Sequence, residues 1–278
     1  MKNKKLFLVV LCLVLIFLFV SAALDSRLKV VHYEIENPKS ETPLRIALIT
    51  DLHSCLYGGE DQSELLENLR AQNPDMVLMG GDIFDSRRMP DKNAEVFLKA
   101  AGKEFRCYYI SGNHEVRHGK LDYYKEIVDS CGITVLDGYN TKLAISAISG
   151  TPDIYGFDDT TAYKNLAEQL DHIEQITENF HFPESFNVLL IHRPEHFEHY
   201  VDIGFDLVLC GHAHGGQWRI PGLLNGLYSP GEGLFPKYAG GLYEKDGTTM
   251  IVSRGLARES TPLPRIFNRP ELVIIDIT

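Results

Sequence analysis

The residues LVLCGHAHGGQW (207–218) begin as a hydrophobic strand and end in a glycine-rich segment that contains two histidines. Four apolar residues lead into Gly211, and His212 and His214 follow it. Residues two apart in an extended chain point to the same side, so both imidazoles face one space. Neighbouring glycines let the backbone run close to a ligand. The stretch therefore predicts a strand whose carboxyl end carries a binding site.

The same arrangement occurs at four earlier places in the chain. Short apolar runs, typical of strands buried on both faces, are each followed directly by a residue that can bind a metal. These runs are 44–50, 75–81, 107–112 and 187–191, and the residues that follow them are Asp51, Asp82, Asn113 and His192. Because ligands bind beyond the carboxyl ends of strands in layered α/β domains, we expect the five strand ends to form one metal or catalytic cluster.

Helices are expected between several of these strands. Amphipathic patterns cover 60–72, 94–101, 121–130 and 163–176. Strands that alternate with helices predict an α/β domain built in layers.

The residue types at the strand ends restrict the metal. Carboxylate, amide oxygen and imidazole ligands suit Mn, Fe or Zn. The five cysteines show no paired spacing such as C-x-x-C, which argues against a structural zinc site and a disulfide framework.

Five short blocks together resemble the signature of the calcineurin-like metallophosphoesterases. In chain order they are DLHS (51–54), GDIFD (81–85), GNHE (112–115), IHRP (191–194) and GHAH (211–214). GHAHGGQ and the segments 230–243, 252–259 and 262–275 are similar to the bacterial membrane-associated branch that includes YkuE-like and YaeI-like proteins. The resemblance implies a four-layer α/β/β/α sandwich over residues 44–278.

The resemblance also implies roles for the matching residues. In the family, two divalent metal ions share a water, whose pKa falls toward ~7 so that it can attack phosphorus. By position the implied ligands are Asp51, His53 and His214 for one ion, Asn113, His192 and His212 for the other, and Asp82 as the bridge between them. His114 would face the substrate and either protonate the leaving alkoxide or steady the transition state. Asp85 and Glu115 would hold the ligands in place.

The implied reaction is hydrolysis of a phosphoester. Some relatives cleave UDP-2,3-diacylglucosamine, so by resemblance alone the substrate would be a lipid-linked phosphodiester or diphosphate. Three alternatives stay open: a general phosphomonoesterase, a catalytically idle homologue that binds a ligand or partner, and a di-iron redox protein. Arg87, Arg88 and Arg193 adjoin the motif residues, and exposure to solvent is the default expectation for each.

The first residues differ from the rest. MKNKK carries three lysines, and the uncharged segment 6–24 reaches roughly 29 Å, close to the ~30 Å core of a bilayer. We expect 1–24 to be a membrane anchor, 25–43 a lead-in segment and 44–278 the catalytic domain. The lysines place the domain outside the cytoplasm. The alternative is a signal peptide cleaved near SAA (21–23), followed by secretion.

The overall charge excludes one class of partner. The chain has 278 residues and a formal net charge of −11. A nucleic-acid-binding groove needs a basic surface, so we expect no nucleic-acid partner. The expected partners are a phosphoester substrate and, through the N-terminal helix, a membrane.

Overall fold

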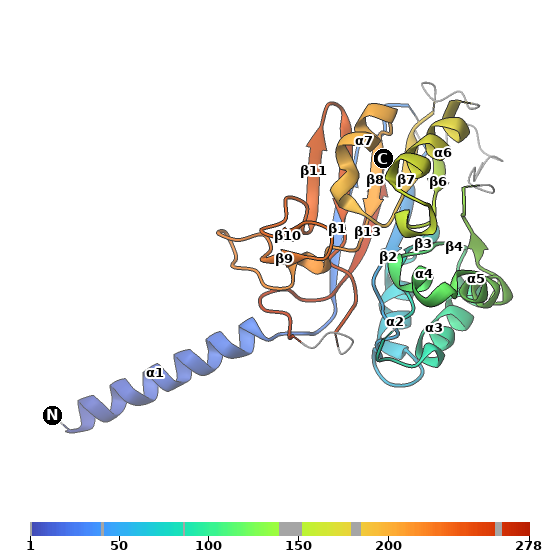
Figure 1. The fold of residues 1–278 in the computed structure, drawn as a ribbon. Coiled ribbons are helices and arrows are strands. Elements are labelled where there is room, and N and C mark those ends of the chain that lie inside the picture. The colour runs from blue at the N-terminus through green and yellow to red at the C-terminus, as the bar shows by residue number, and fades with distance from the viewer. Residues whose placement is uncertain (1, 40–41, 86, 139–151, 179–184, 259–262) are drawn as a thin grey trace.

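The computed structural model describes residues 2–39, 42–85, 87–138, 152–178, 185–258 and 263–278. Two sheets carry most of the strands (Figure 1). The first has six strands in the order β1 (Lys29–Ile35), β13 (Glu271–Ile277), β2 (Leu44–Ile49), β3 (Met76–Gly80), β4 (Cys107–Ile110) and β5 (Thr134–Val135). The second has five strands in the order β11 (Gly241–Lys245), β12 (Thr248–Val252), β8 (Leu207–Cys210), β7 (Asn187–Leu190) and β6 (Asp153–Gly156). Strands β9 (Tyr228–Ser229) and β10 (Gly233–Leu234) form a small separate pair.

Most strand pairs are parallel. Only β13 with β2 and β11 with β12 run antiparallel among the pairs within the two large sheets of the described chain. Parallel strands require crossover segments, and the helices between them supply these connections. The predicted runs 44–50, 75–81, 107–112, 187–191 and 207–211 all contain strands, so the expected strand pattern is confirmed.

The core between the sheets explains why these strands are apolar throughout. Leu48, Leu78 and Ile110 of the first sheet share one buried cluster with Leu190 and Leu209 of the second. Each such side chain, fully buried, contributes about 1.5–3 kcal/mol of hydrophobic free energy. The opposite faces of the central strands are also buried, under helices, so apolar residues predominate along these strands until they end.

The helices cover the two outer faces. On the six-stranded sheet lie α2 (Ser63–Gln72), α3 (Asp91–Glu104) and α5 (Leu121–Ser130), and on the five-stranded sheet lie α6 (Leu166–Glu178) and α7 (Phe197–Ile203). Phe97 of α3 and Tyr124 of α5 pack in the first outer core, and Ile173 of α6 and Phe197 of α7 in the second. The predicted four-layer α/β/β/α sandwich is therefore confirmed.

All four expected helices are present: α5 has the predicted bounds, and the other three have shifted ends. Helix α3 begins at Asp91, three residues before the first predicted apolar position, because Pro90 lies just before the helix and Asp91 favours its first turn. Helix α2 begins at Ser63 because Gln62 adopts a left-handed conformation with φ of 59°. One short helix, α4 (Asn113–Val116), was not predicted, since four residues are too few for a helical period.

The remaining elements are single turns of 3-10 helix. They are η1 (Arg117–Gly119), η2 (Thr160–Ala162), η3 (Pro194–His196) and η4 (His214–Gly216). Three of them, η1, η3 and η4, follow motif residues closely and help to turn the chain at the strand ends.

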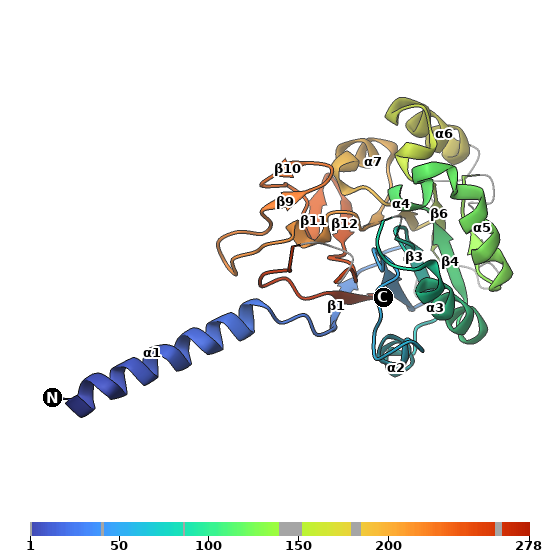
Figure 2. The same cartoon turned by 60° about the horizontal axis from the view of Figure 1, so that its bottom comes forward.

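The N-terminal helix α1 (Lys2–Ala23) extends away from the domain, as Figure 2 shows. Its segment Lys4–Ala23 has the length and composition to cross a membrane, features that an N-terminal signal sequence shares. Its end touches the domain: the Phe19 and Phe267 ring centroids lie 5.4 Å apart, and the Phe267 N–H donates to the Ala23 carbonyl at 2.7 Å. Beyond it, β1 pairs with β13 over seven residues, so part of segment 25–43 belongs to the six-stranded sheet.

Candidate metal centre

The polar residues at the strand ends meet between the two sheets. Asp51 and Asp82 follow β2 and β3 of the six-stranded sheet, whereas His212 follows β8 of the five-stranded sheet. The Asp51 carboxylate accepts the backbone N–H of His212 at 3.0 and 3.1 Å, which joins the two sheets at this point. The expectation that the strand ends converge is thus met in the structure.

The backbone at these positions is unusual. Asp51, His53, Asp82, His212 and His214 all have positive φ, between 47° and 66°. A non-glycine residue in this region costs of order 1 kcal/mol or more, and such strain concentrates at functional sites.

Two motif glycines permit close approach of the chain. A Cβ on Gly112 would lie 2.4 Å from the Asp82 backbone nitrogen, and one on Gly211 would lie 2.5 Å from Asp51 Oδ2. Any larger residue would therefore displace an aspartate of the site.

A first group of potential ligands consists of Asp51, His53 and His214. One ligand atom from each lies within 4.8 Å of the others. Both ring nitrogens of His53 and Nδ1 of His214 are buried and have no hydrogen-bond partner in the described part of the chain. A buried polar atom left in this state costs about 1–3 kcal/mol. A cation at this position would be bound by these nitrogens, so the residues fit a metal site.

A second group consists of Asp82, His192 and His212, again within 4.8 Å. His192 Nδ1 lies 2.8 Å from the Gly80 carbonyl, which requires a proton on Nδ1 and leaves Nε2 as the ring nitrogen that could bind a metal. Nε2 in turn lies 3.3 Å from Asp82 Oδ2 and 3.1 Å from His212 Nδ1. Once His192 Nε2 loses its proton, it and His212 Nδ1 are placed to bind one cation.

Asn113 completes the second group. Its amide has two possible orientations. The one that satisfies hydrogen bonding places the nitrogen 2.9 Å from His212 Nδ1 and the oxygen 3.1 Å from Arg117 Nη2. Rotation of the amide by 180° places the oxygen beside His212 Nδ1 instead. That second orientation is the one a metal ligand requires, because only the oxygen can coordinate.

Asp82 lies between the two groups. Its Oδ2 is 3.5 Å from His53 Nε2 and 3.3 Å from His192 Nε2, so one oxygen faces a histidine of each group. Its Oδ1 accepts the backbone N–H of His114 at 2.7 Å. The carboxylate is thus held in a position suited to bridging.

The charges in the cluster depend strongly on one another. Burial alone would raise the pKa of Asp82, but the charges of His192, His53 and His114 and a hydrogen bond with His192 together outweigh burial and lower this pKa well below its usual value. Burial lowers the pKa of His192, and Asp82 more than compensates, raising it to about 10. Burial also raises the pKa of Asp51. The protein by itself therefore keeps a proton on His192, and a cation would have to displace it.

Glu115 fastens two of the motif loops together. Its carboxylate accepts the backbone N–H groups of Asp82 at 3.0 Å, Ile83 at 2.7 Å, Phe84 at 3.0 Å and Gly112 at 2.9 Å. Burial and then the charge of Asp82 raise the pKa of Glu115 to about 7, while these donors act in the opposite direction. A side chain that accepts four N–H groups positions the ends of β3 and β4 relative to each other.

Asp85 has a similar function for the next loop. It accepts the backbone N–H groups of Arg87 at 3.2 Å, Arg88 at 2.8 Å and Met89 at 2.9 Å. It also lies 3.3 Å from His114 Nδ1. Burial alone would raise the pKa of Asp85, but the nearby His114 and His53 rings and the backbone N–H donors outweigh burial and lower it.

His114 faces the pocket and contacts Arg117. Its Nε2 is 3.0 Å from Arg117 Nη1, and since arginine only donates, Nε2 is the acceptor and Nδ1 carries the proton toward Asp85. Burial lowers the pKa of His114, partly offset by Asp85. The ring is therefore neutral near pH 7.

A pocket of about 440 Å³ opens over both groups. Its lining includes His53, Asp82, Asn113, His212 and His214 on the inner side, and Tyr228, Pro230 and Leu263 toward the outside. Gln217 also lines it and donates to the Leu263 carbonyl at 2.7 Å.

Sequence reasoning missed an ion-pair group beside His212. Arg193, expected to be exposed by default, has a side chain only 17% exposed and lies 2.7 Å from Asp159 and 3.1 Å from Glu195. Its Nη1 is 3.4 Å from His212 Nε2. Asp158 and Asp159 follow β6 as another strand end with aspartates, and this signal could have been found.

Comparison with known proteins identifies the relatives of the chain. The calcineurin-like phosphoesterase family matches residues 44–216. The chain is 30% identical to an uncharacterised metallophosphoesterase of Campylobacter jejuni, over 98% of this chain and 69% of the relative. It is 26% identical to the uncharacterised metallophosphoesterase YkuE of Bacillus subtilis, over 84% of this chain and 78% of that one. It is 28% identical to the phosphodiesterase YaeI of Escherichia coli, over 84% of this chain and 82% of that one.

Among solved structures, the chain is similar to the NAD nucleotidase NadN of Haemophilus influenzae. The TM-score is 0.49 at 16% identity, over 78% of this chain and 46% of that one. The chain thus spans about half the length of this larger protein.

Proposed function

The chain belongs to the calcineurin-like phosphoesterase family and is a metal-dependent phosphoester hydrolase, and we propose that its strand-end site holds two divalent ions. The seven ligands would divide into two groups of three with one shared carboxylate: Asp51, His53 and His214 for one ion, Asn113, His192 and His212 for the other, and Asp82 between them. This set of nitrogen and oxygen ligands suits Mn, Fe or Zn.

One observation above all supports two ions. A single carboxylate oxygen, Asp82 Oδ2, faces His53 on one side and His192 on the other, at 3.5 and 3.3 Å. On the His53 side the ring nitrogens have no hydrogen-bond partner in the described structure, and on the other side His192 Nε2 and His212 Nδ1 lie 3.1 Å apart. Each side thus needs a positive centre of its own, because one cation cannot satisfy both sets at coordination distances of about 2.0–2.2 Å.

When bound, the ions supply Lewis-acid activation of the phosphoryl group and of the attacking water. The chain itself supplies orientation. The neutral His114 ring accepts from Arg117 and so directs that guanidinium toward the pocket, where it can stabilise negative charge in the transition state. Of the two roles considered for His114, this arrangement favours steadying the transition state over donating a proton.

The metal proposal is tested with Asp82→Asn in the full-length protein. Loss of the shared carboxylate should reduce metal content from two ions per chain to less than one and nearly abolish hydrolysis of bis(p-nitrophenyl) phosphate. Asp122→Asn, on the exposed face of α5, is the matched control and should behave as wild type. Two ions and wild-type turnover in Asp82→Asn would refute the dinuclear site. Two ions without turnover in the wild type would indicate a catalytically idle homologue.

We also propose that α1 anchors the enzyme in the cell membrane with the catalytic domain outside the cytoplasm. The segment Lys4–Ala23 is long and apolar enough to span, and lysines precede its apolar core. Its apolar side chains are exposed to solvent in the isolated chain, which is unfavourable unless lipid covers them. Secretion after cleavage is the alternative outcome.

A lipid-linked substrate is the third part of the proposal. Leu223, Leu234 and Phe235 are 82%, 67% and 67% exposed, so they are not buried under the sheet. Both views show the β9–β10 segment on the side of the domain from which α1 leaves (Figures 1 and 2). Exposed apolar side chains near the pocket rim and the anchor suit contact with acyl chains.

Substrate preference tests this part separately. We expect kcat/KM for a lipid-linked phosphodiester or diphosphate to exceed that for a soluble sugar monophosphate, at one metal concentration. A tenfold preference for the monophosphate, about 1.4 kcal/mol in transition-state binding, would refute the lipid proposal and indicate a general phosphomonoesterase.

A further inference from the structure

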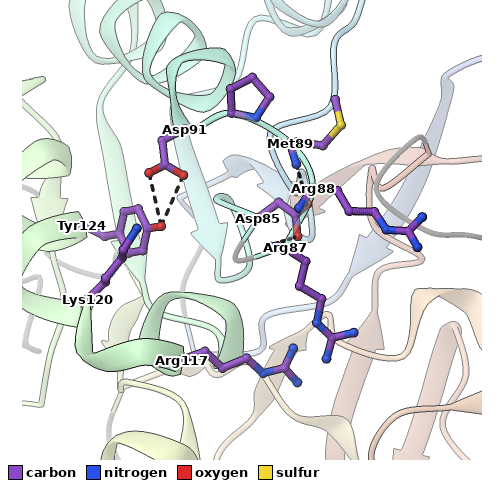
Figure 3. A pocket seen from close by; sticks show the side chains of 9 residues that line it. Asp85, Arg87, Arg88, Met89, Asp91, Arg117, Lys120 and Tyr124 are labelled. Atoms are coloured by element: carbon purple, nitrogen blue, oxygen red, sulfur yellow. Dashed lines mark hydrogen bonds between the residues drawn. The ribbon is translucent and has the colours of Figure 1, made fainter.

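A second pocket, of about 360 Å³, adjoins the metal centre and is lined by cations (Figure 3). We call it the basic pocket; its charged lining residues are Asp85, Arg87, Arg88, Asp91, Arg117 and Lys120. It shares Asp85, Arg87 and Arg117 with the pocket over the metal centre, so the two pockets adjoin along these residues. Four cations in one place are unexpected in a chain with a net charge of −11.

The arginines that line the shared wall are not neutralised. Neither Arg87 nor Arg117 has a carboxylate within 4.0 Å of its guanidinium among the described residues, although carboxylates pair with many other arginines of the chain. Figure 3 shows both side chains extending into the same region, whereas Arg88 extends away from it. Burial and then the charge of Arg87 lower the pKa of Arg117, as expected for two cations close together.

The two carboxylates of the pocket are already engaged. Asp85 accepts three backbone N–H groups and pairs with His114. Asp91 accepts the Tyr124 hydroxyl at 3.3 and 3.4 Å. Lys120 Nζ lies 5.8 Å from the centre of the Tyr124 ring, at the far end of the pocket. The pocket therefore offers a positive wall at each end of a space large enough for a phosphate group.

We propose that the basic pocket binds a second phosphate group of the substrate, beyond the phosphoryl group that is hydrolysed, through Arg87, Arg117 and Lys120. Arginine suits phosphate because its planar fork can donate two parallel hydrogen bonds. This inference rests on the proposed function and narrows it to substrates with two phosphates, such as a diphosphate. It does not depend on whether the substrate carries a lipid.

The test measures binding, so that it does not depend on turnover. The two probes are methylenediphosphonate and methylphosphonate, neither of which contains a P–O–P bond that the enzyme could cleave. Each is titrated calorimetrically into the full-length, manganese-loaded protein in detergent. We expect the diphosphonate to bind at least tenfold more tightly than the monophosphonate. In the double variant Arg87→Gln/Lys120→Gln this ratio should fall below threefold.

Arg88→Gln is the control for the Arg87 half of the double variant, because it removes one positive charge from the same loop outside the proposed contact. It should retain the tenfold ratio. A wild-type ratio below threefold would overturn the proposal without reference to any variant. A tenfold ratio that persists in the double variant would also overturn it, because the preference for the diphosphonate would then come from the metal ions and not from the basic pocket.

The same preparations distinguish failure of the two proposals. If the wild type takes up no manganese and does not hydrolyse bis(p-nitrophenyl) phosphate, the proposed function fails. If it does both but shows no preference for the diphosphonate, only the basic pocket fails as a phosphate site.

Discussion

Glu115 gives the sharpest quantitative prediction of the structure. Its two oxygens each accept two backbone N–H groups: Ile83 and Phe84 on Oε1, Asp82 and Gly112 on Oε2. In Glu115→Gln one oxygen becomes an NH₂ group, and either orientation of the amide leaves two buried N–H groups without an acceptor. At about 1–3 kcal/mol for each, the expected loss of unfolding free energy is roughly 2–6 kcal/mol.

The assay is thermal unfolding of the full-length protein in detergent after chelation of metals, followed by circular dichroism. For a domain of this size 1 kcal/mol shifts Tm by about 2–4 °C, so we expect a fall of roughly 4–24 °C. Since Glu115 fixes the loops that carry Asp82 and Asn113, metal affinity should also fall about 10–100-fold.

Glu126→Gln is the control for this experiment. Glu126 lies on the exposed side of α5, and the substitution there should change stability by less than about 0.5 kcal/mol. If Glu115→Gln unfolds within 1 °C of the Glu126→Gln control, the four hydrogen bonds do not hold the motif loops and the reasoning is wrong.

Three further predictions follow from the site and the anchor. His114→Ala should keep its metals but slow hydrolysis equally for p-nitrophenyl and phenyl esters; a loss at least tenfold larger for phenyl esters would instead make His114 the proton donor. Arg193→Gln should lower the free energy of unfolding by about 3–5 kcal/mol, because it leaves the fully buried Asp159 without its ion-pair partner. A loss no larger than that of Arg88→Gln would show that the Arg193–Asp159 pair is not needed for stability. Protease added to intact cells should digest the domain, and protection until lysis would reverse the proposed orientation.

Much of the fold followed from local sequence. The apolar runs before Asp51, Asp82, Asn113, His192 and His212 predicted strands correctly, because a strand buried on both faces must be apolar along its whole length. Helix existence was also predicted, and so were both ends of α5, whereas α2 and α3 begin elsewhere than predicted because the left-handed Gln62 and Pro90 set their starts locally.

The membership of the candidate site was also readable from the sequence. Polar residues at the ends of buried strands are local signals that identify Asp51, Asp82, Asn113, His192 and His212. The ligand roles, and the parts of His114, Asp85 and Glu115, came instead from the resemblance of the five motif blocks to the family. Their arrangement around the metals remains a prediction that awaits metal analysis.

Tertiary structure alone determined how these residues are related in space. The hydrogen bond between Asp51 and His212 joins two sheets across 161 residues, and no local pattern specifies which strand ends will meet. The same is true of the Arg193–Asp159 pair and of the unpaired arginines in the basic pocket. Whether an arginine is neutralised depends on which carboxylates the packing of distant segments brings within reach, and that is decided only when the two sheets close on each other.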